Sequence, residues 1–353
     1  MKQIMHIAAV LVLAFFAAGC QREGLVPDGA CSQVTFSVEV PGSVVTKTDG
    51  GADGKEQVVV PEVNNLVYAV YRTSALNQKD AQASIKREDL VYQYNPKASG
   101  ESTAFVDDNA HVSIELISHQ SYIILFWAQV DQIWVSGTDF DLMEVACPDE
   151  LTANSQAYEA FSGVAYVSDL QGSRRESVEL TRPFAQVNIA SSDPATFDVD
   201  VLSSSVVIGG AAASFNVATQ TAGNATKTVT FAAAANPVGP FSADYQHYVA
   251  RNHVFANGTV SVSYTITTER HGTITNADAP IYNVPVARNY RTNIVGSLLA
   301  SNVGYNVELQ QGWSDELSNE PVASVGGVEY NTLEAAADAA RDGSDKTIKL
   351  LRR

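Results

Sequence analysis

The sequence TVSVSYTITT, residues 259–268, shows the pattern that decides the fold. Its residues Val260, Val262, Tyr264 and Ile266 alternate with serines and threonines. Successive side chains of a β-strand point to opposite faces, so this alternation predicts a strand with one buried and one exposed face. The same pattern recurs along most of the chain.

Other segments carry related strand signals. Val34, Phe36, Val38 and Val40 alternate with polar residues, which predicts a second half-buried strand. The stretches 66–71 and 122–130 are apolar nearly throughout, as expected of strands buried on both faces. Further strands are expected at 112–116, 161–167, 177–180, 184–189, 206–208, 215–217, 229–231, 281–286, 292–298 and 305–309. No convincing amphipathic helix is expected before about residue 320.

Many short strands joined by glycine- and asparagine-containing turns predict an all-β protein with two tandem β-sandwich domains. The expected limits are 32–175 for the N-terminal sandwich and 176–315 for the C-terminal one. Residues 322–353 differ, since an alanine-rich helix at 333–340 is expected between short strands. This segment is therefore expected to be a small C-terminal β-α-β tail.

Composition excludes several classes of protein. The chain has 353 residues, of which 45 % are hydrophobic and 17 % charged, so it can bury a sizeable core and is not a disordered chain. Its 22 Lys and Arg against 39 Asp and Glu give a net charge of −17, which repels phosphate backbones, so no nucleic-acid partner is expected. Three cysteines are too few for a disulfide framework.

The N-terminus carries an export signal. Lys2 precedes an apolar run over residues 7–18, which is too short to span a bilayer but suits a signal peptide. The run closes on Ala17–Cys20 (AAGC), which matches a bacterial lipobox. Cleavage is then expected between Gly19 and Cys20, followed by acylation of Cys20. An ordinary signal peptide with an incidental cysteine is the alternative.

This signal sets the expected location and redox environment. Residues 1–19 are the signal peptide and residues 20–31 a tether, and the acylated protein is expected in the outer membrane, facing the cell surface. Cys31 and Cys147 remain after processing. They could pair in an oxidising compartment, but two buried thiols are an equal alternative.

Acidic pairs do not amount to a catalytic motif. Asp139/Asp141 and Asp198/Asp200 would each share one face of a strand, and glycosidases use pairs of carboxylates. With 39 acidic residues in the chain such pairs also arise by chance. We therefore expect no enzyme, no catalytic residue and no cofactor.

Metal-binding signals are equally weak. No His-Glu-x-x-His motif occurs, and His247 and His253 are expected to be surface residues that share a strand face. Asp49 and Asp53 lie in a glycine-rich loop that could bind Ca²⁺, but a solvated loop is favoured because the spacing matches no EF-hand. We expect no metal.

The tryptophans separate into two groups. Trp127 lies within the apolar stretch 122–130 and is expected in the core. Trp134 and Trp313 lie near turns and are weak candidates for stacking on sugars.

Two motifs resemble a known family. Residues 182–189 (RPFAQVNI), residues 289–296 (NYRTNIVG) and the closing Tyr305–Val307 and Gly312–Trp313 resemble fimbrillin-like lipoproteins of Bacteroidetes. With the lipobox, the resemblance covers about residues 1–315. It implies two transthyretin-like β-sandwiches and a role as a pilus subunit or pilus-tip adhesin. It also implies that polymerising subunits are cut after an N-terminal arginine, and that a neighbour's strand fills the groove so opened.

The sequence departs from the pattern of a polymerising subunit. Between Cys20 and Tyr71 the only arginine is Arg22, which precedes the first expected strand. A cut there would release the lipid without opening a groove. Arg72 is the remaining candidate protease site, at the end of a strand expected to be buried. This departure favours an anchored or accessory component.

The tail resembles the opening coil of a right-handed parallel β-helix, a fold that includes pectate lyases. The similarity covers residues 328–335, 339–343 and 348–351. A solenoid needs about three coils for stability, and only one fits here. We therefore interpret the tail as a lone cap-like unit that carries no lyase activity.

Together these features predict a non-enzymatic surface lipoprotein that acts in adhesion or pilus assembly. Its expected partners are the outer membrane, other fimbrillin-like subunits that add a strand, and host or bacterial surface glycans or proteins. The alternative is a glycan-binding lipoprotein of a polysaccharide-uptake system. Exposed aromatic residues gathered on one domain would favour glycan binding, whereas an apolar groove beneath the first strand would favour assembly.

The lipobox generates the first prediction. Cys20→Ala removes the acyl acceptor and should move the protein from the membrane fraction to the soluble fraction, as measured by fractionation and fatty-acid labelling. Incorporation of labelled fatty acid into the variant would show that Cys20 is not the anchor.

Overall fold

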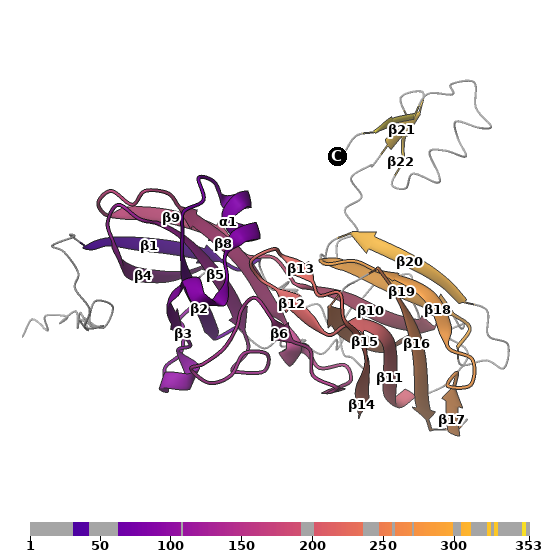
Figure 1. Ribbon diagram of the computed structural model, residues 1–353. Coiled ribbons are helices and arrows are strands. Elements are labelled where there is room, and N and C mark those ends of the chain that lie inside the picture. The colour runs from indigo at the N-terminus through magenta and orange to yellow at the C-terminus, as the bar shows by residue number, and fades with distance from the viewer. Residues whose placement is uncertain are drawn as a thin grey trace, which may run out of the picture.

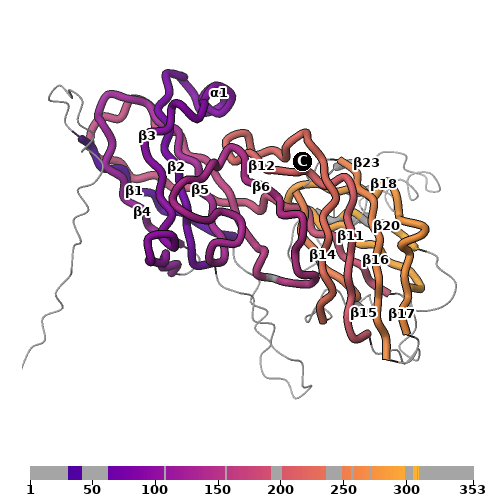
Figure 2. The backbone as a smooth tube through the Cα atoms, turned by 60° about the horizontal axis from the view of Figure 1, so that its bottom comes forward, coloured from indigo at the N-terminus to yellow at the C-terminus, as the bar shows by residue number. Residues whose placement is uncertain are grey.

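The protein is all-β, as the sequence predicts (Figure 1). The computed structural model describes residues 31–41, 63–106, 109–191, 201–235, 247–255, 258–269, 272–298, 305–311, 323–325, 328–330 and 348–350. Two groups of β-sheets lie side by side along the molecule, in both Figure 1 and Figure 2.

The first group is a sandwich of two sheets. One sheet has the order β4 (Asn109–Ile117), β1 (Cys31–Glu39), β9 (Arg174–Glu179). The other has the order β3 (Leu90–Tyr94), β2 (Asn65–Thr73), β5 (Ser121–Gln129), β8 (Ala160–Val167). The boundary expected between residues 175 and 176 falls within β9, whose partner is β1, so the chain crosses to the second group after this strand.

The core between these two sheets is apolar. Val34, Phe36 and Val38 are completely buried, so the predicted inward face of the first strand is confirmed. The ring of Phe36 meets Phe126 of β5 edge-on, with 5.3 Å between ring centroids. Aromatic pairs in this geometry add to the stabilisation from burial.

The second group contains a four-stranded and a six-stranded sheet. The four-stranded sheet has the order β15 (His247–Phe255), β10 (Phe184–Ser191), β19 (Tyr290–Gly296), β20 (Tyr305–Gln311). The six-stranded sheet has the order β17 (Gly272–Thr275), β16 (Gly258–Thr268), β11 (Val201–Ala212), β14 (Thr226–Ala235), β7 (Glu150–Thr152), with β18 (Ile281–Val286) also on β16. Val260, Val262, Tyr264 and Ile266 of β16 are all buried, which confirms the alternation at 259–268.

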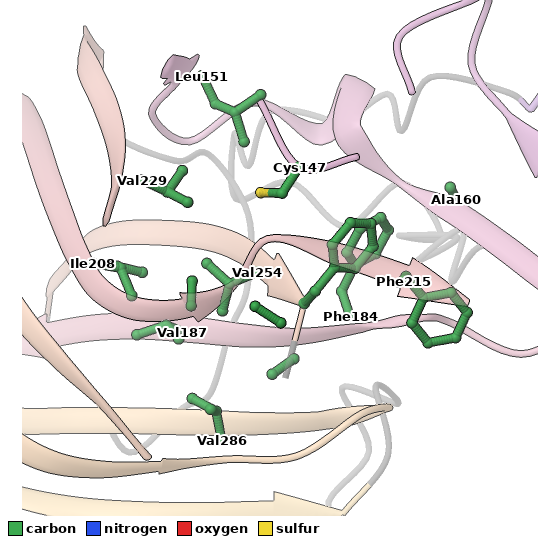
Figure 3. Packing of buried hydrophobic residues seen from close by; sticks show 14 of the residues in the cluster. Cys147, Leu151, Ala160, Phe184, Val187, Ile208, Phe215, Val229, Val254 and Val286 are labelled. Carbon is green, nitrogen blue, oxygen red and sulfur yellow. The ribbon is translucent and has the colours of Figure 1, made fainter. Parts of the chain in front are cut away.

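The two groups share one hydrophobic cluster. Residues 131–158 follow β5 of the first group, yet they carry β6 (Val145–Ala146) and β7, which pair with strands of the second group. A small sheet of β6, β12 (Ser214–Asn216) and β13 (Thr221–Ala222) lies here. Figure 3 shows Phe184, Phe215 and Cys147 among the buried side chains of this cluster.

Short helical segments occur in the first group. The sequence analysis missed α1 (Gln78–Ser84), whose N-terminus is capped by the Asn77 side chain accepting from the Asp80 N–H at 2.9 Å. All but two of its seven residues are exposed, which is why no amphipathic pattern marks it. Three 3₁₀ turns, η1 (Arg87–Asp89), η2 (Lys97–Ser99) and η3 (Gln156–Tyr158), complete these segments.

The tail forms a small sheet of its own. It has the order β22 (Val328–Tyr330), β21 (Ala323–Val325), β23 (Ile348–Leu350), so the expected strands are present. The helix expected at 333–340 lies outside the described residues. Within the part of the chain that the structure describes, no helix is both long and apolar enough to cross a membrane.

The burial of Phe36 generates the second prediction. Phe36→Ala should lower the free energy of unfolding by about 3–5 kcal/mol, because a large aromatic side chain leaves a cavity between the two sheets. Urea unfolding measures the change, and Thr35→Ala, at a neighbouring outward position that bonds Ser113 on the surface, is the matched control. Equal stabilities of the two variants would place β1 outside the core.

Candidate functional site

The candidate site is the first strand, β1, and the groove that it fills. β1 is the central strand of its sheet: residues 31–39 pair antiparallel with β4, and residues 34–39 pair parallel with β9. Removing β1 would therefore leave unpaired backbone groups on both neighbours. Unpaired strand edges bind an added strand readily.

The floor of this groove is apolar. Val34, Phe36 and Val38 pack in one cluster with side chains of the facing sheet, among them Val70 and Phe126. These contacts would be exposed to water if β1 left. A replacement strand would need apolar side chains at alternate positions, because only every second residue faces the groove.

The end of β1 is held by the chain that follows β9. The Leu180 N–H donates to the Glu39 carbonyl oxygen at 2.8 Å, and the side chain of Leu180 is fully buried in the same cluster. β1 is thus held along its length and at its end. Residues 42–62, which join β1 to β2, lie outside the described residues.

Arg72, the candidate protease site, lies within β2. Its side chain is exposed, but its backbone pairs with Tyr122 in the β2–β5 ladder. β2 is flanked by β3 and β5, so it is not an edge strand. A protease that needs an extended, unpaired backbone would first have to open this ladder.

The residues of the two family-like motifs face one another across parallel strands. Asn188 of β10 donates through Nδ2 to Asn293 Oδ1 of β19 at 2.8 Å. Arg291 donates through Nε to Gln186 Oε1 at 3.2 Å. All four side chains are buried, and this polar lattice (Gln186, Asn188, Arg291 and Asn293) holds β10 and β19 in register. The residues of the two motifs therefore serve to pair β10 with β19.

Comparison with known proteins gives a family. The model of one protein family, described as a family of unknown function (DUF6562), matches residues 28–340. The chain belongs to DUF6562. None of the proteins with curated descriptions matches it.

Several solved structures resemble this DUF6562 chain. A candidate cell adhesion protein from Bacteroides eggerthii has 13 % identity and a TM-score of 0.45, covering 82 % of this chain and 98 % of its own. A fimbrial assembly protein from Parabacteroides distasonis has 12 % identity and a TM-score of 0.43, covering 80 % and 100 %. The tip fimbrial protein Mfa3 from Porphyromonas gingivalis has 10 % identity and a TM-score of 0.42, also covering 80 % and 100 %. Similarities of this size do not assign a function to the chain.

The expectation that His253 is a surface residue is wrong. His253 of the DUF6562 chain is only 2 % exposed. In the β10–β15 ladder it lies opposite Gln186, which is a residue of the polar lattice. Burial, followed by the charges of Arg251, Arg182 and Arg291, lowers the pKa of His253 well below its ordinary value. Sequence reasoning missed this because three consecutive polar residues, Arg251–His253, resemble an exposed segment. The side chain of His247 lies outside the described part of the chain.

Arg182, which opens the first motif, joins the two groups of sheets. Its guanidinium lies 4.7 Å from the ring centroid of Phe161 in β8 and 3.5 Å from the Glu159 carboxylate. Both partners belong to the first group, whereas Arg182 leads into β10 of the second. A cation over an aromatic ring with a nearby carboxylate is a favourable setting for a buried guanidinium such as that of Arg182.

The tryptophans that the structure describes are structural. Trp127 is completely buried, as predicted. Trp134 packs against core side chains: its Nε1–H donates to the Tyr158 carbonyl oxygen at 3.0 Å, and the centroid of its ring lies 4.7 Å from that of Phe184. Trp134 therefore belongs to the shared cluster, although the turn around it suggested exposure. Trp313 lies outside the described residues.

Two of the acidic candidates, Asp139 and Asp141, share one arginine partner. Asp139 and Asp141 both pair with Arg87, each at 2.9 Å. Among the described residues no group of three or more His, Cys, Asp or Glu could hold a metal ion. Asp49, Asp53, Asp198 and Asp200 lie outside the described residues.

The cysteines lie in different surroundings. Cys31 is exposed at the start of β1, whereas Cys147 is buried in the shared cluster, and no disulfide joins these two described residues. Burial raises the pKa of the Cys147 thiol to about 11, so it is protonated at neutral pH. Gly19 and Cys20 lie outside the described residues.

Burial of His253 generates the third prediction. Because its pKa is lowered in the folded state, the unfolded chain binds the proton first as the pH falls below about 6.5. The free energy of unfolding should therefore fall by up to about 1.4 kcal/mol per pH unit below that value from this residue. Urea unfolding between pH 7.5 and 5 measures the slope. The variant His253→Gln should have a shallower slope, and an equal slope in both proteins would contradict the assignment.

Proposed function

We propose that this protein is a non-enzymatic, lipid-anchored protein of the cell surface that acts in adhesion or pilus assembly as an anchored or accessory component. The lipobox ending at Cys20 supports the anchor in the outer membrane. The motifs at 182–189 and 289–296 support membership of the fimbrillin-like type. We also propose that the two groups of sheets act as the two tandem sandwich domains of such a protein.

The position of β1 carries this proposal. A surface protein that assembles by strand exchange needs a strand whose loss opens an apolar groove with free backbone edges on both sides. β1 meets this requirement, because it lies between β4 and β9 and buries Val34, Phe36 and Val38. Other fimbrillin-like subunits are the partners that such a groove would accept.

The arginine positions support the anchored role. Arg22 precedes β1, so cleavage there would release the lipid and leave the groove filled. Arg72 lies in the β2–β5 ladder, and no arginine occurs between residues 23 and 71. A protein that keeps β1 in place retains a closed first sandwich, as a terminal or anchoring component requires.

A second role has one observation in its favour. Tyr68, Tyr92 and Tyr94 gather at one edge of the first sandwich beside Glu101. A group of aromatic side chains on one side of a domain is the feature that favours a glycan-binding surface protein.

The arginine positions generate the fourth prediction. Folded, lipid-free protein treated with an arginine-specific protease should yield no fragment beginning at Thr73, because Arg72 and Thr73 are both paired with β5 in the β2–β5 ladder. N-terminal sequencing of the products and native gels measure the outcome.

The matched control is Lys47→Arg, which places an arginine between β1 and β2. This variant should yield a fragment beginning at Thr48 and then form multimers. Efficient cleavage of the wild-type protein after Arg72, followed by denaturant-resistant multimers, would make it a shaft or tip subunit and overturn the anchored role.

A further inference from the structure

The edge strand β3 carries two half-buried tyrosines, Tyr92 and Tyr94, that pack against Tyr68 of β2. We call these three residues the tyrosine cluster. The ring centroid of Tyr68 lies 6.0 Å from that of Tyr92 and 5.7 Å from that of Tyr94. The rings of Tyr92 and Tyr94 are nearly parallel, at 12°, with centroids 6.4 Å apart. Aromatic side chains thus line the edge of the first sandwich.

This cluster has a rigid floor. Tyr68 is only 7 % exposed and packs against Phe126, with 6.2 Å between ring centroids. Phe126 in turn meets Phe36 of β1. Side chains locked by core packing lose little entropy when a ligand binds, which favours binding.

Hydrogen-bonding groups lie at the open side of the cluster. The Tyr94 hydroxyl donates to Glu101 Oε2 at 2.6 Å, and Glu101 is exposed. Burial, assisted by Glu101, raises the pKa of Tyr94 to about 12, so its phenol is neutral at physiological pH. The site therefore combines phenol hydroxyls with a carboxylate acceptor.

We propose that the tyrosine cluster and Glu101 form a binding site for a neutral glycan. Tyrosine rings offer an apolar surface to the C–H groups of a sugar, while their hydroxyls exchange hydrogen bonds with sugar hydroxyls. The Glu101 carboxylate accepts hydrogen bonds from sugar hydroxyls and repels uronate, sulfate or phosphate groups. This inference adds a ligand class to the proposed surface role, and its biological use rests on that role.

The arrangement fits a sugar better than an organic cation. A quaternary ammonium group binds in a cage, where the faces of several aromatic rings surround a space that the cation fills. In the tyrosine cluster the three rings pack against one another, and Tyr68 is part of the core. The accessible parts are the half-buried rings of Tyr92 and Tyr94 and the exposed Glu101 carboxylate.

The test is affinity electrophoresis of the mature chain carrying Cys20→Ala in native gels. Each gel contains mannan, xylan, galactan or glucan, with polygalacturonate as the anionic counterpart. We expect retardation by at least one neutral polysaccharide and none by polygalacturonate. Tyr94→Ala and Glu101→Gln should each weaken the apparent affinity about tenfold. Tyr94→Phe keeps the ring, removes the hydroxyl, and should cause a smaller loss.

The matched control is Tyr282→Ala, which removes a tyrosine that is 68 % exposed on β18 and should leave retardation unchanged. Thermal unfolding establishes that each variant is folded, and Glu101→Gln tests the proposal even if Tyr94→Ala does not fold. No retardation by any of the four neutral polysaccharides would overturn the inference. So would equal retardation of wild type, Tyr94→Ala and Glu101→Gln. The assay needs neither lipid nor strand exchange, so its failure is distinguishable from failure of the proposed assembly role.

Discussion

The packing of three phenylalanine rings around Trp127 is the interaction on which the rest of the structure depends. The ring centroid of Trp127 lies 6.3 Å from those of Phe184 and Phe215 and 6.5 Å from that of Phe255. Trp127 comes from β5 of the first group, and the three phenylalanines come from the second. Burial of so much aromatic surface in one place strongly stabilises the contact between the groups.

β5 holds this position because both of its faces are buried. Phe126 points into the first sandwich, where it meets Phe36, and the next residue, Trp127, points to the second group. Two neighbouring residues of β5 therefore have different roles: Phe126 packs against β1, and Trp127 packs against the second group. If another strand replaced β1, the contacts of Phe126 would change, whereas the contacts of Trp127 with the second group would stay in place.

The same aromatic series reaches the edge of the molecule. Phe36, Phe126 and Tyr68 contact one another in turn, and Tyr68 supports Tyr92 and Tyr94. The proposed glycan site is thus built on the floor of the groove that β1 fills. A surface protein that keeps β1 in place also keeps this site intact, which is consistent with an anchored adhesive role.

Sequence alone determined most of the longer strands, because the alternation of side chains in a strand is a local property, but it did not indicate the short strands β3, β6, β7, β13 and β17. The inward faces of β1 and β16 and the double burial of β2 and β5 follow from runs of six to ten residues. Only the tertiary structure decided that β1 is a central strand, since β9, one of its two partners, begins at residue 174. It also decided that His253 is buried and that Trp134, partly buried, packs against the shared cluster. A polar or turn residue is buried only when another part of the chain packs over it, and the local sequence pattern does not show which part that will be.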